Sequence, residues 1–279
     1  MTIEEFEINS KDGNRLYGKY WLPENDITPP AVLCLVHGLG EHTGRYEGLA
    51  EFFTSNNIPV FSFDQVGHGK SDGKRGHGGK YEILLDNIEN LLKVARREYN
   101  DALMFLYGQS WGGNIVANYV LKKNTSELAG AILSAPWLRL PFKPAPSKVF
   151  LARMMNSIFP SYTEKSEIDP EKLSKDKTVV GAYKSDPLVH DRISASLFFN
   201  AVRNGEEAIN NSFKLTIPML AIHGKEDKLT SWNATEEFVQ GTSGKASFQL
   251  YDDVRHEPHN DLEREEVLSD VLSWINSKS

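Results

Sequence analysis

Cysteine is nearly absent from this 279-residue sequence, and the single thiol, Cys34, lies in an apolar run over residues 31–36. Without a second cysteine there is no intramolecular disulfide, so the fold must depend on a buried core. The sequence also lacks a run of about 18 apolar residues that would span a bilayer and a basic N-terminal stretch followed by an apolar one. These absences predict a cytoplasmic protein.

Clusters of positive charge are also lacking. Lys and Arg number 31 against 38 Asp and Glu, which gives a formal net charge of −7. Because neutralising nucleic-acid phosphates requires concentrated basic side chains, the composition argues against a nucleic-acid partner. The hydrophobic fraction of 40% and the charged fraction of 25% are ordinary for a globular enzyme. Nothing in the composition indicates an oligomeric state.

Motifs for nucleotides and metals are incomplete. Gly69-Lys70-Ser71 is similar to the end of a phosphate-binding loop, but Asp64 stands where that loop requires glycine. The stretch His256-Glu257-Pro258-His259 is one residue short of H-E-x-x-H, and its proline would break the helix that carries this zinc motif. The sequence therefore predicts neither a metal nor another cofactor.

Short apolar strands alternate with helical segments over most of the chain. This pattern predicts an α/β fold with a mostly parallel sheet and helices on both of its faces. Two strands, at 3–9 and 15–22, are expected to form an antiparallel hairpin at the sheet edge. Further strands are expected at 31–36, 58–63, 103–108, 129–134, 217–222 and 246–251, and helices at 44–56, 81–98, from 113 onward, 231–240 and 261–276.

The alternation breaks down between residues 137 and 211. This stretch contains several prolines, an amphipathic patch over 149–159 and a second apolar patch at 197–199. We predict that 137–211 is a helical cap inserted over the sheet. Residues 1–136 and 212–279 would then form one core domain.

The amphipathic patch of this cap has three interpretations. Phe150, Met154 and Phe159 are expected to line an acyl channel, because thioethers and rings form adaptable apolar walls. Alternatively, these side chains only pack the cap onto the core. A third possibility is peripheral membrane contact, since Lys143, Lys148 and Arg153 flank the patch with positive charge.

Ser110 lies at a corner between an apolar strand and a helix, within Gly108-Gln109-Ser110-Trp111-Gly112. A strand that reverses directly into a helix brings backbones close together, and the two glycines permit that approach. Such a nucleophile elbow places the serine hydroxyl at a helix N-terminus, where negative charge is favoured. The alternative is a serine that only caps the helix.

A serine nucleophile needs a base, and the base is most effective when a carboxylate fixes its tautomer. In this topology the order along the chain is serine, acid, histidine, each in a loop at the carboxyl end of a strand. Asp227 follows the next-to-last strand and His256 follows the last one, so both have the expected order. The alternatives are Glu226 or Asp252 as the acid and His259 as the base.

A tetrahedral intermediate also needs backbone donors for its oxyanion. One is expected from the N–H of Trp111, directly after the nucleophile. The other is expected from Leu39, in the loop that follows strand 31–36. His37, at the start of that loop, is interpreted as a residue that shapes the loop.

Six stretches of the chain together resemble a known family, namely residues 37–46, 64–71, 75–77, the serine elbow, 223–227 and 256–257. The family they resemble is the monoacylglycerol lipase and lysophospholipase branch of the α/β-hydrolases. The resemblance implies an eight-stranded sheet, a cap over the site and an apolar tunnel for one acyl chain. It also implies a triad of Ser110, Asp227 and His256, with Leu39 and Trp111 as the oxyanion donors.

Two residues depart from this branch, because Gln109 and Trp111 stand where its members usually have His and Met. A tryptophan here suggests an indole that narrows the acyl site. The leading interpretation is a serine carboxylester hydrolase for an amphiphilic monoester, either a monoacylglycerol or a lysophospholipid. The alternatives are an esterase for short or non-lipid esters, a peptidase of the same fold, and a non-catalytic scaffold that binds a ligand.

Overall fold

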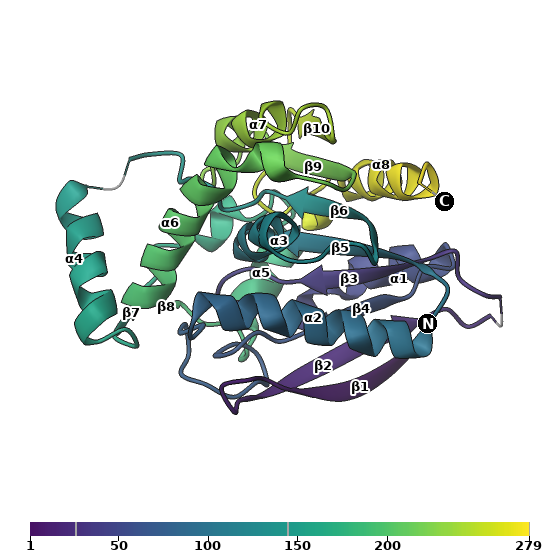
Figure 1. Cartoon of the computed structure of the whole chain (residues 1–279), viewed down its shortest axis with the longest axis horizontal. Coiled ribbons are helices and arrows are strands. Elements are labelled where there is room, and N and C mark those ends of the chain that lie inside the picture. The colour runs from purple at the N-terminus through teal and green to yellow at the C-terminus, as the bar shows by residue number, and fades with distance from the viewer. Residues whose placement is uncertain (26, 144, 279) are drawn as a thin grey trace.

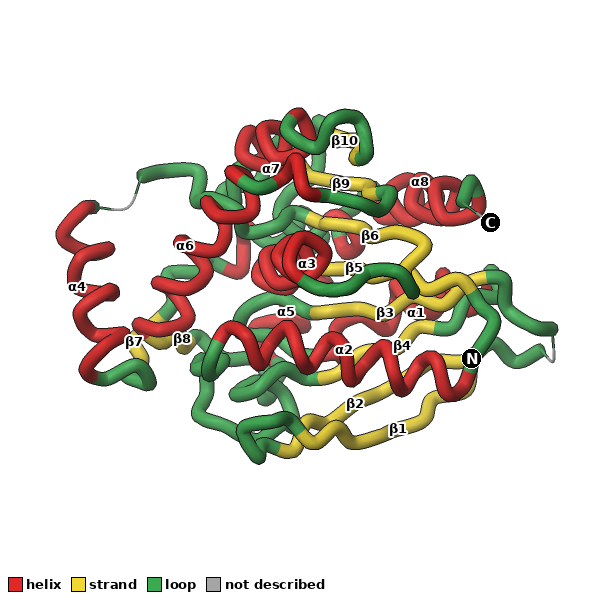
Figure 2. The backbone as a smooth tube through the Cα atoms, viewed as in Figure 1, coloured by secondary structure: helices red, strands yellow, loops and turns green. Residues whose placement is uncertain are grey.

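An eight-stranded sheet runs through the centre of the molecule in the order β1-β2-β4-β3-β5-β6-β9-β10 (Figures 1 and 2). The computed structural model describes residues 1–25, 27–143 and 145–278. Of Lys148, within the last range, it describes only the backbone. β1 and β2 are antiparallel, as are β2 and β4, and the remaining neighbours are parallel. The predicted hairpin and mostly parallel sheet are therefore confirmed. The strands are β1 (Thr2–Asn9), β2 (Arg15–Leu22), β3 (Ala31–Val36), β4 (Val60–Phe63), β5 (Leu103–Gln109), β6 (Leu128–Ser134), β9 (Met219–Gly224) and β10 (Ala246–Tyr251).

Helices cover both faces of the sheet, as the sequence predicts. One core joins the sheet to α2, α3 and α7, whereas a second core joins its other face to α1 and α8. In the described ranges, no helix is both long and apolar enough to cross a membrane. These five helices are α1 (Glu47–Ser55), α2 (Tyr81–Glu98), α3 (Trp111–Lys122), α7 (Trp232–Gln240) and α8 (Arg264–Asn276), with short 3-10 helices η1 (Thr43–Tyr46), η3 (Ser212–Lys214) and η4 (Pro258–Asn260).

The parallel strands end in register. Val36 is paired with Gly108 across β3 and β5, and Ser134 is paired with Ile222 across β6 and β9. Tyr251 at the end of β10 lies opposite Gly224 at the end of β9. Because these carboxyl ends lie along one edge of the sheet, the loops that follow them are brought together there.

Residues 137–211, here called the cap segment, lie between β6 and β9 in the sequence. In Figure 1, α4 stands at the far left, beyond α6, and packs on that helix. The strands β7 and β8 form a separate antiparallel pair that the sequence did not predict, since each has three residues. That the segment forms a cap distinct from a core domain stays a prediction. Its elements are α4 (Pro146–Ile158), β7 (Thr163–Lys165), η2 (Pro170–Lys172), α5 (Lys177–Ser185), β8 (Arg192–Ser194) and α6 (Ala195–Asn210).

The boundaries of some helices differ from the expected ones. The expected helix at 44–56 is divided into η1 and α1, and α8 starts at Arg264 rather than at 261. The later start of α8 has a local cause, because the fully buried Asp261 accepts hydrogen bonds from the backbone N–H groups of Lys175 and Arg255. Because the Asp261 carboxylate holds these two loops together through hydrogen bonds, the regular helix begins only after Asp261.

Candidate active site

Ser110 occupies a strained corner between β5 and α3. Its backbone has φ +54° and ψ −114°, which is costly for a residue with a Cβ and is characteristic of functional corners. A Cβ on Gly112 would lie 2.1 Å from the carbonyl oxygen of Val36, and one on Gly108 would lie 2.6 Å from that of Gly112. The close approach predicted for this elbow is therefore present, and it leaves the side chain of Ser110 facing the pocket.

A chain of hydrogen bonds joins Ser110, His256 and Asp227. The Oγ of Ser110 lies 2.9 Å from Nε2 of His256. On the other side of the ring, Nδ1 lies 2.8 Å from Oδ2 of Asp227. The structure thus brings together the three residues that the sequence singled out, in the geometry in which an imidazole accepts the serine proton.

The Asp227 carboxylate is buried and accepts several hydrogen bonds. Oδ2 accepts one from Nε2 of His223 at 2.9 Å and one from Oγ1 of Thr230 at 2.7 Å, while Oδ1 accepts from the backbone N–H of Leu229 and of Thr230. Burial by itself would raise its pKa, but the charge of His256 and the hydrogen bond from His223 hold that pKa far below the usual range. The carboxylate is therefore ionised, and it fixes Nδ1 of His256 as a donor.

The alternative acids form ion pairs with lysines, and the alternative base packs against an aromatic ring. Oε2 of Glu226 lies 3.4 Å from Nζ of Lys175, and the exposed Asp252 pairs with a lysine of the neighbouring loop. His259 is buried and stacks on Tyr46, with ring centroids 4.7 Å apart. Neither of these acids nor His259 is placed in the chain of hydrogen bonds at Ser110.

The backbone N–H of Leu39 belongs to the loop that follows β3, and that of Trp111 belongs to the first residue of α3, directly after Ser110. Among the described residues, none accepts a hydrogen bond from either N–H group. The loop that holds Leu39 is fixed by Glu41, whose Oε1 accepts from the Gly38 N–H and from the Tyr46 hydroxyl, both at 2.7 Å. Two uncommitted donors next to a serine hydroxyl are what an oxyanion requires.

A buried ion network connects this loop to the loop of His256, and the sequence reasoning missed it. Nη1 of Arg45 lies 2.6 Å from Oε2 of Glu41, and its two terminal nitrogens bind both oxygens of Glu257. Burial would raise the pKa of Glu257, but the Arg45 guanidinium lowers it to about 2. The network ties the residue next to His256 to the Leu39 loop. The only signal for it in the sequence is that charged residues stand inside the motifs that carry the resemblance, at Glu41, Arg45 and Glu257.

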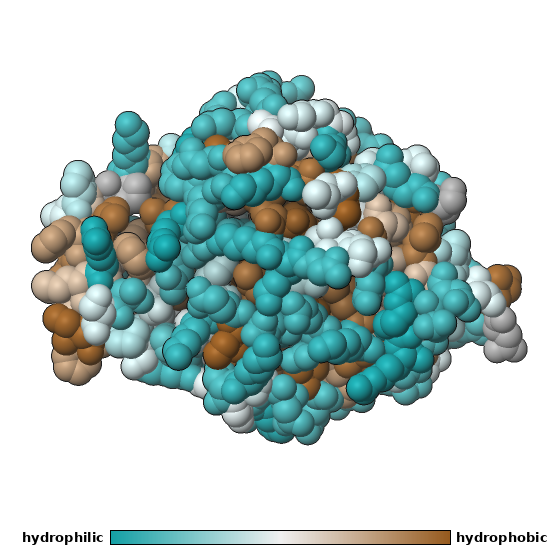
Figure 3. All heavy atoms as spheres, viewed as in Figure 1, coloured by the Kyte–Doolittle hydropathy of each residue, from teal (hydrophilic) through white to brown (hydrophobic). Residues whose placement is uncertain are grey.

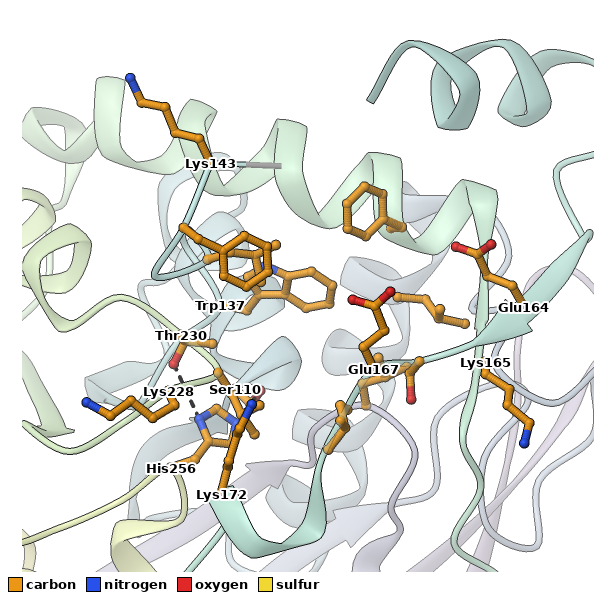
Figure 4. Close-up of a pocket in the computed structure, with 18 of the residues that line it drawn as sticks. Ser110, Trp137, Lys143, Glu164, Lys165, Glu167, Lys172, Lys228, Thr230 and His256 are labelled. Atoms are coloured by element: carbon orange, nitrogen blue, oxygen red, sulfur yellow. Dashed lines mark hydrogen bonds between the residues drawn. The ribbon is translucent and has the colours of Figure 1, made fainter. Parts of the chain in front are cut away.

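A pocket of about 490 Å³ opens at Ser110 and His256 (Figure 4). Part of its wall comes from the cap segment, through β7, η2 and α6 and through the residues that follow β6. The wall is apolar over much of its length, as a site for an acyl chain requires. The apolar side chains that line it are Leu39, Trp137, Leu140, Phe142, Ile168, Ile193, Phe198 and Leu229.

Two expectations about pocket side chains have to be corrected. Phe150, Met154 and Phe159 do not line this pocket, and they are 68, 41 and 63% exposed. The reason is that α4 packs on α6 along one side only, which turns these side chains to the solvent. The indole of Trp111 does not narrow the pocket either, because it is buried against Gly78 and tilted over the ring of His68.

Gln109 is the other residue that differs from the family pattern, and its side chain contacts the loop that holds His256. Its Nε2 donates a hydrogen bond to the backbone carbonyl of His256 at 2.8 Å. Within the described ranges, no cluster of three His, Cys, Asp or Glu side chains is arranged to hold a metal ion. The chemistry of this donor set is that of acyl transfer to a serine.

An α/β sheet with a Ser–His–Asp chain along its carboxyl edge defines a serine hydrolase of the α/β-hydrolase fold. The family model described as "Serine aminopeptidase, S33" matches residues 27–263, so the chain belongs to that family. By class it is a carboxylic ester hydrolase, and within the superfamily it is similar to the monoacylglycerol lipases.

Three known proteins illustrate this similarity. An abhydrolase domain-containing protein of Dictyostelium discoideum is 34% identical over all of this chain, which spans 29% of that protein's length. A monoacylglycerol lipase of Mycolicibacterium smegmatis is 30% identical, with 99% of this chain and 98% of that protein covered. The crystal structure of the Paleococcus ferrophilus monoacylglycerol lipase is also 30% identical, covers 95% of this chain and 99% of its own, and has a TM-score of 0.85.

Proposed function

We propose that this enzyme hydrolyses an amphiphilic carboxylic monoester, a monoacylglycerol or a lysophospholipid, through an acyl-enzyme on Ser110. The observation that carries the proposal is the hydrogen-bonded chain from Ser110 to His256 and Asp227, of which Ser110 and His256 line a largely apolar pocket. The monoacylglycerol lipases named above support the same substrate class.

The proposed reaction has two halves. Nε2 of His256 takes the proton of Ser110 as Oγ attacks the ester carbonyl carbon, and the N–H groups of Leu39 and Trp111 stabilise the oxyanion. His256 then gives its proton to the leaving alkoxide. A water molecule, activated by the same imidazole, attacks the acyl-enzyme and releases the fatty acid. Asp227 stabilises the imidazolium that forms in each half.

The test measures fatty-acid release by the wild type and by Ser110→Ala. The panel contains monoacylglycerols of several chain lengths, lysophosphatidylcholine, short water-soluble esters and a proline amide. Turnover of a monoacylglycerol or lysolipid is expected, with a loss of at least about 10⁴-fold in the variant. Activity on short esters alone would move the substrate away from lipids, and activity on the amide alone would favour a peptidase.

A serine-directed phosphonate distinguishes these outcomes from a non-catalytic scaffold. Covalent labelling of the wild type that is lost in Ser110→Ala supports the proposed enzyme. Folded wild type that neither reacts with the phosphonate nor turns over any substrate would contradict it.

We further propose that the cap segment contacts a lipid surface while the rest of the chain stays in water. α4 exposes large apolar side chains, and Figure 3 shows the resulting hydrophobic patch at the left edge of the molecule. Arg153 lies on the same helix, and Lys143 precedes it. Apolar side chains flanked by basic ones suit the interface of an anionic bilayer. The exposed apolar side chains are Phe150, Leu151, Met154, Ile158 and Phe159.

A cytoplasmic location and the absence of a nucleic-acid partner remain predictions from the sequence.

A further inference from the structure

The pocket at Ser110 carries positive charge that a neutral monoacylglycerol would not use. Besides the apolar wall, it is lined by four lysines and two glutamates. In Figure 4, Lys172 and Lys228 lie on the side of the pocket that holds Ser110 and His256, whereas Glu164 and Lys165 lie at the other end. The four lysines are Lys143, Lys165, Lys172 and Lys228, and the glutamates are Glu164 and Glu167.

This local charge is opposite in sign to that of the chain. The cap segment, residues 137–211, contains 11 Lys and Arg against 9 Asp and Glu, whereas the rest of the chain contains 20 against 29. A protein with a negative net charge repels anions at long range. The lysines of the pocket therefore attract an anion only over short distances, once it is near the pocket. The charge is therefore suited to recognition within the pocket.

Lys172 and Lys228 are also not neutralised by acidic neighbours. Nearby lysines are paired: Lys175 lies 3.4 Å from a carboxylate oxygen of Glu226, and Lys177 lies 2.6 Å from one of Glu171. In the part of the chain that the structure describes, neither Lys172 nor Lys228 forms an ion pair or a side-chain hydrogen bond. Lys172 is half-buried, on η2, and Lys228 directly follows Asp227.

We propose that Lys172 and Lys228 bind an anionic group on the alcohol part of the substrate, so that the preferred substrate is a monoacyl ester with a phosphate headgroup. This inference rests on the proposed function. The acyl chain occupies the apolar wall, and the ester carbonyl lies at Ser110. The headgroup belongs to the alkoxide that His256 protonates, so it lies on the side of the two lysines. Ammonium groups bind phosphate through charge-assisted hydrogen bonds.

The experiment compares two esters that differ only in the phosphate, 1-butyrylglycerol and 1-butyrylglycerol 3-phosphate. Both are used as monomers in solution, so attraction of the lysines to an anionic membrane does not contribute. Butyrate release is measured with the wild type, with Lys172→Gln/Lys228→Gln and with Lys225→Gln as the matched control. Lys225 is an exposed lysine of the same loop as Lys228, it is paired with Asp252, and it does not line the pocket.

We expect the wild type to hydrolyse the phosphate ester with a kcat/KM about tenfold above that of the neutral ester, which is the effect of one charge-assisted hydrogen bond. The double variant should lose this preference, because its kcat/KM falls further on the phosphate ester than on the neutral ester through a higher KM, and it should show a weaker dependence on salt. The control should behave as the wild type does.

Equal kcat/KM for the two esters in the wild type would overturn the inference, and so would an equal loss on both in the double variant. In either case hydrolysis of the neutral ester would leave the proposed function intact. If neither ester is hydrolysed and the phosphonate does not label Ser110, both the function and the inference are contradicted.

Discussion

The imidazole of His256 lies among several acidic groups that favour its charged form. Burial lowers its pKa, but the charge and the hydrogen bond of Asp227 outweigh this, with smaller contributions from Glu257 and Glu41, so the pKa lies above its usual value. The base in the proposed mechanism must be neutral before it accepts the proton of Ser110. Activity of the free enzyme should therefore be lost as the pH falls through this raised pKa.

We accordingly expect kcat/KM for a neutral monoester to rise along an acid limb whose midpoint lies above about 6.5. Glu257→Gln removes one of the acidic neighbours, so its midpoint should be lower than that of the wild type. Glu237→Gln, at an exposed site paired with Arg139, should leave the midpoint unchanged. Circular dichroism checks that each variant is folded. A midpoint well below 6, or one that does not respond to Glu257→Gln, would show that His256 is not the titrating base.

The sequence singled out some residues of this site and not others. Ser110, Asp227 and His256 each follow a strand of the sheet, and the order of strands predicts that their loops meet. Arg45 and Glu257 also lie in recognisable motifs, but they are separated by 212 positions. Charged residues are normally solvated, and only the folded chain shows that these two form a buried pair.

At the scale of elements, the approach of α3 to β3 determines where Ser110 stands. We expect Gly112→Ala to lower the free energy of unfolding by about 1–3 kcal/mol, because its Cβ would collide with the carbonyl oxygens of Val36 and His37. The kcat/KM should fall by more than the loss of folded protein explains, because the residues with these carbonyls lead directly into the loop that holds Leu39. Urea unfolding and kcat/KM are the measurements.

The matched control is Gly48→Ala in α1, where a Cβ meets nothing within 4 Å. This change should raise the stability by about 0.5–1 kcal/mol, because alanine favours the helix more than glycine does. A stable and fully active Gly112→Ala variant would mean that the close packing of this corner is not required.

The elements that the sequence predicted well are those with a regular pattern of apolar side chains. The helix α2 spans the expected residues, and β3 and β10 match the expected strands. The sequence pattern of α4 shows an amphipathic helix but not what its apolar face contacts. A periodic pattern reports that apolar side chains share a face, and it does not distinguish a core, a pocket and a lipid surface.

At the scale of the whole molecule, the exposed face of α4 determines how the enzyme would meet an aggregated substrate. Phe150→Ser/Phe159→Ser should change the free energy of unfolding by no more than about 0.5 kcal/mol, as exposed substitutions usually do. Activity on a monomeric ester should also be kept. Co-sedimentation with anionic phosphatidylglycerol vesicles should weaken, because the apolar contact with the acyl region is removed.

Phe213→Ser provides the control for this variant, since Phe213 is 61% exposed on η3 and lies outside the cap segment. It should co-sediment as the wild type does. If the α4 variant and the wild type bind vesicles equally, the cap segment does not contact the membrane through these side chains.

The chain leaves the sheet after β6 and returns to it as β9, and these two strands are direct neighbours. Because the two strands are parallel, the chain leaves β6 at the carboxyl edge of the sheet and enters β9 at the opposite edge, so it has to cross the sheet in between. The helix α6 makes part of this return, since it packs along α3, where Asn114 donates a hydrogen bond to the carbonyl of Ala201 and Asn118 to that of Asn204. A protein engineer who exchanges the pocket wall to change the substrates accepted would therefore keep α6 and replace only the part of the cap segment that precedes it, while the serine corner and the histidine loop stay in place.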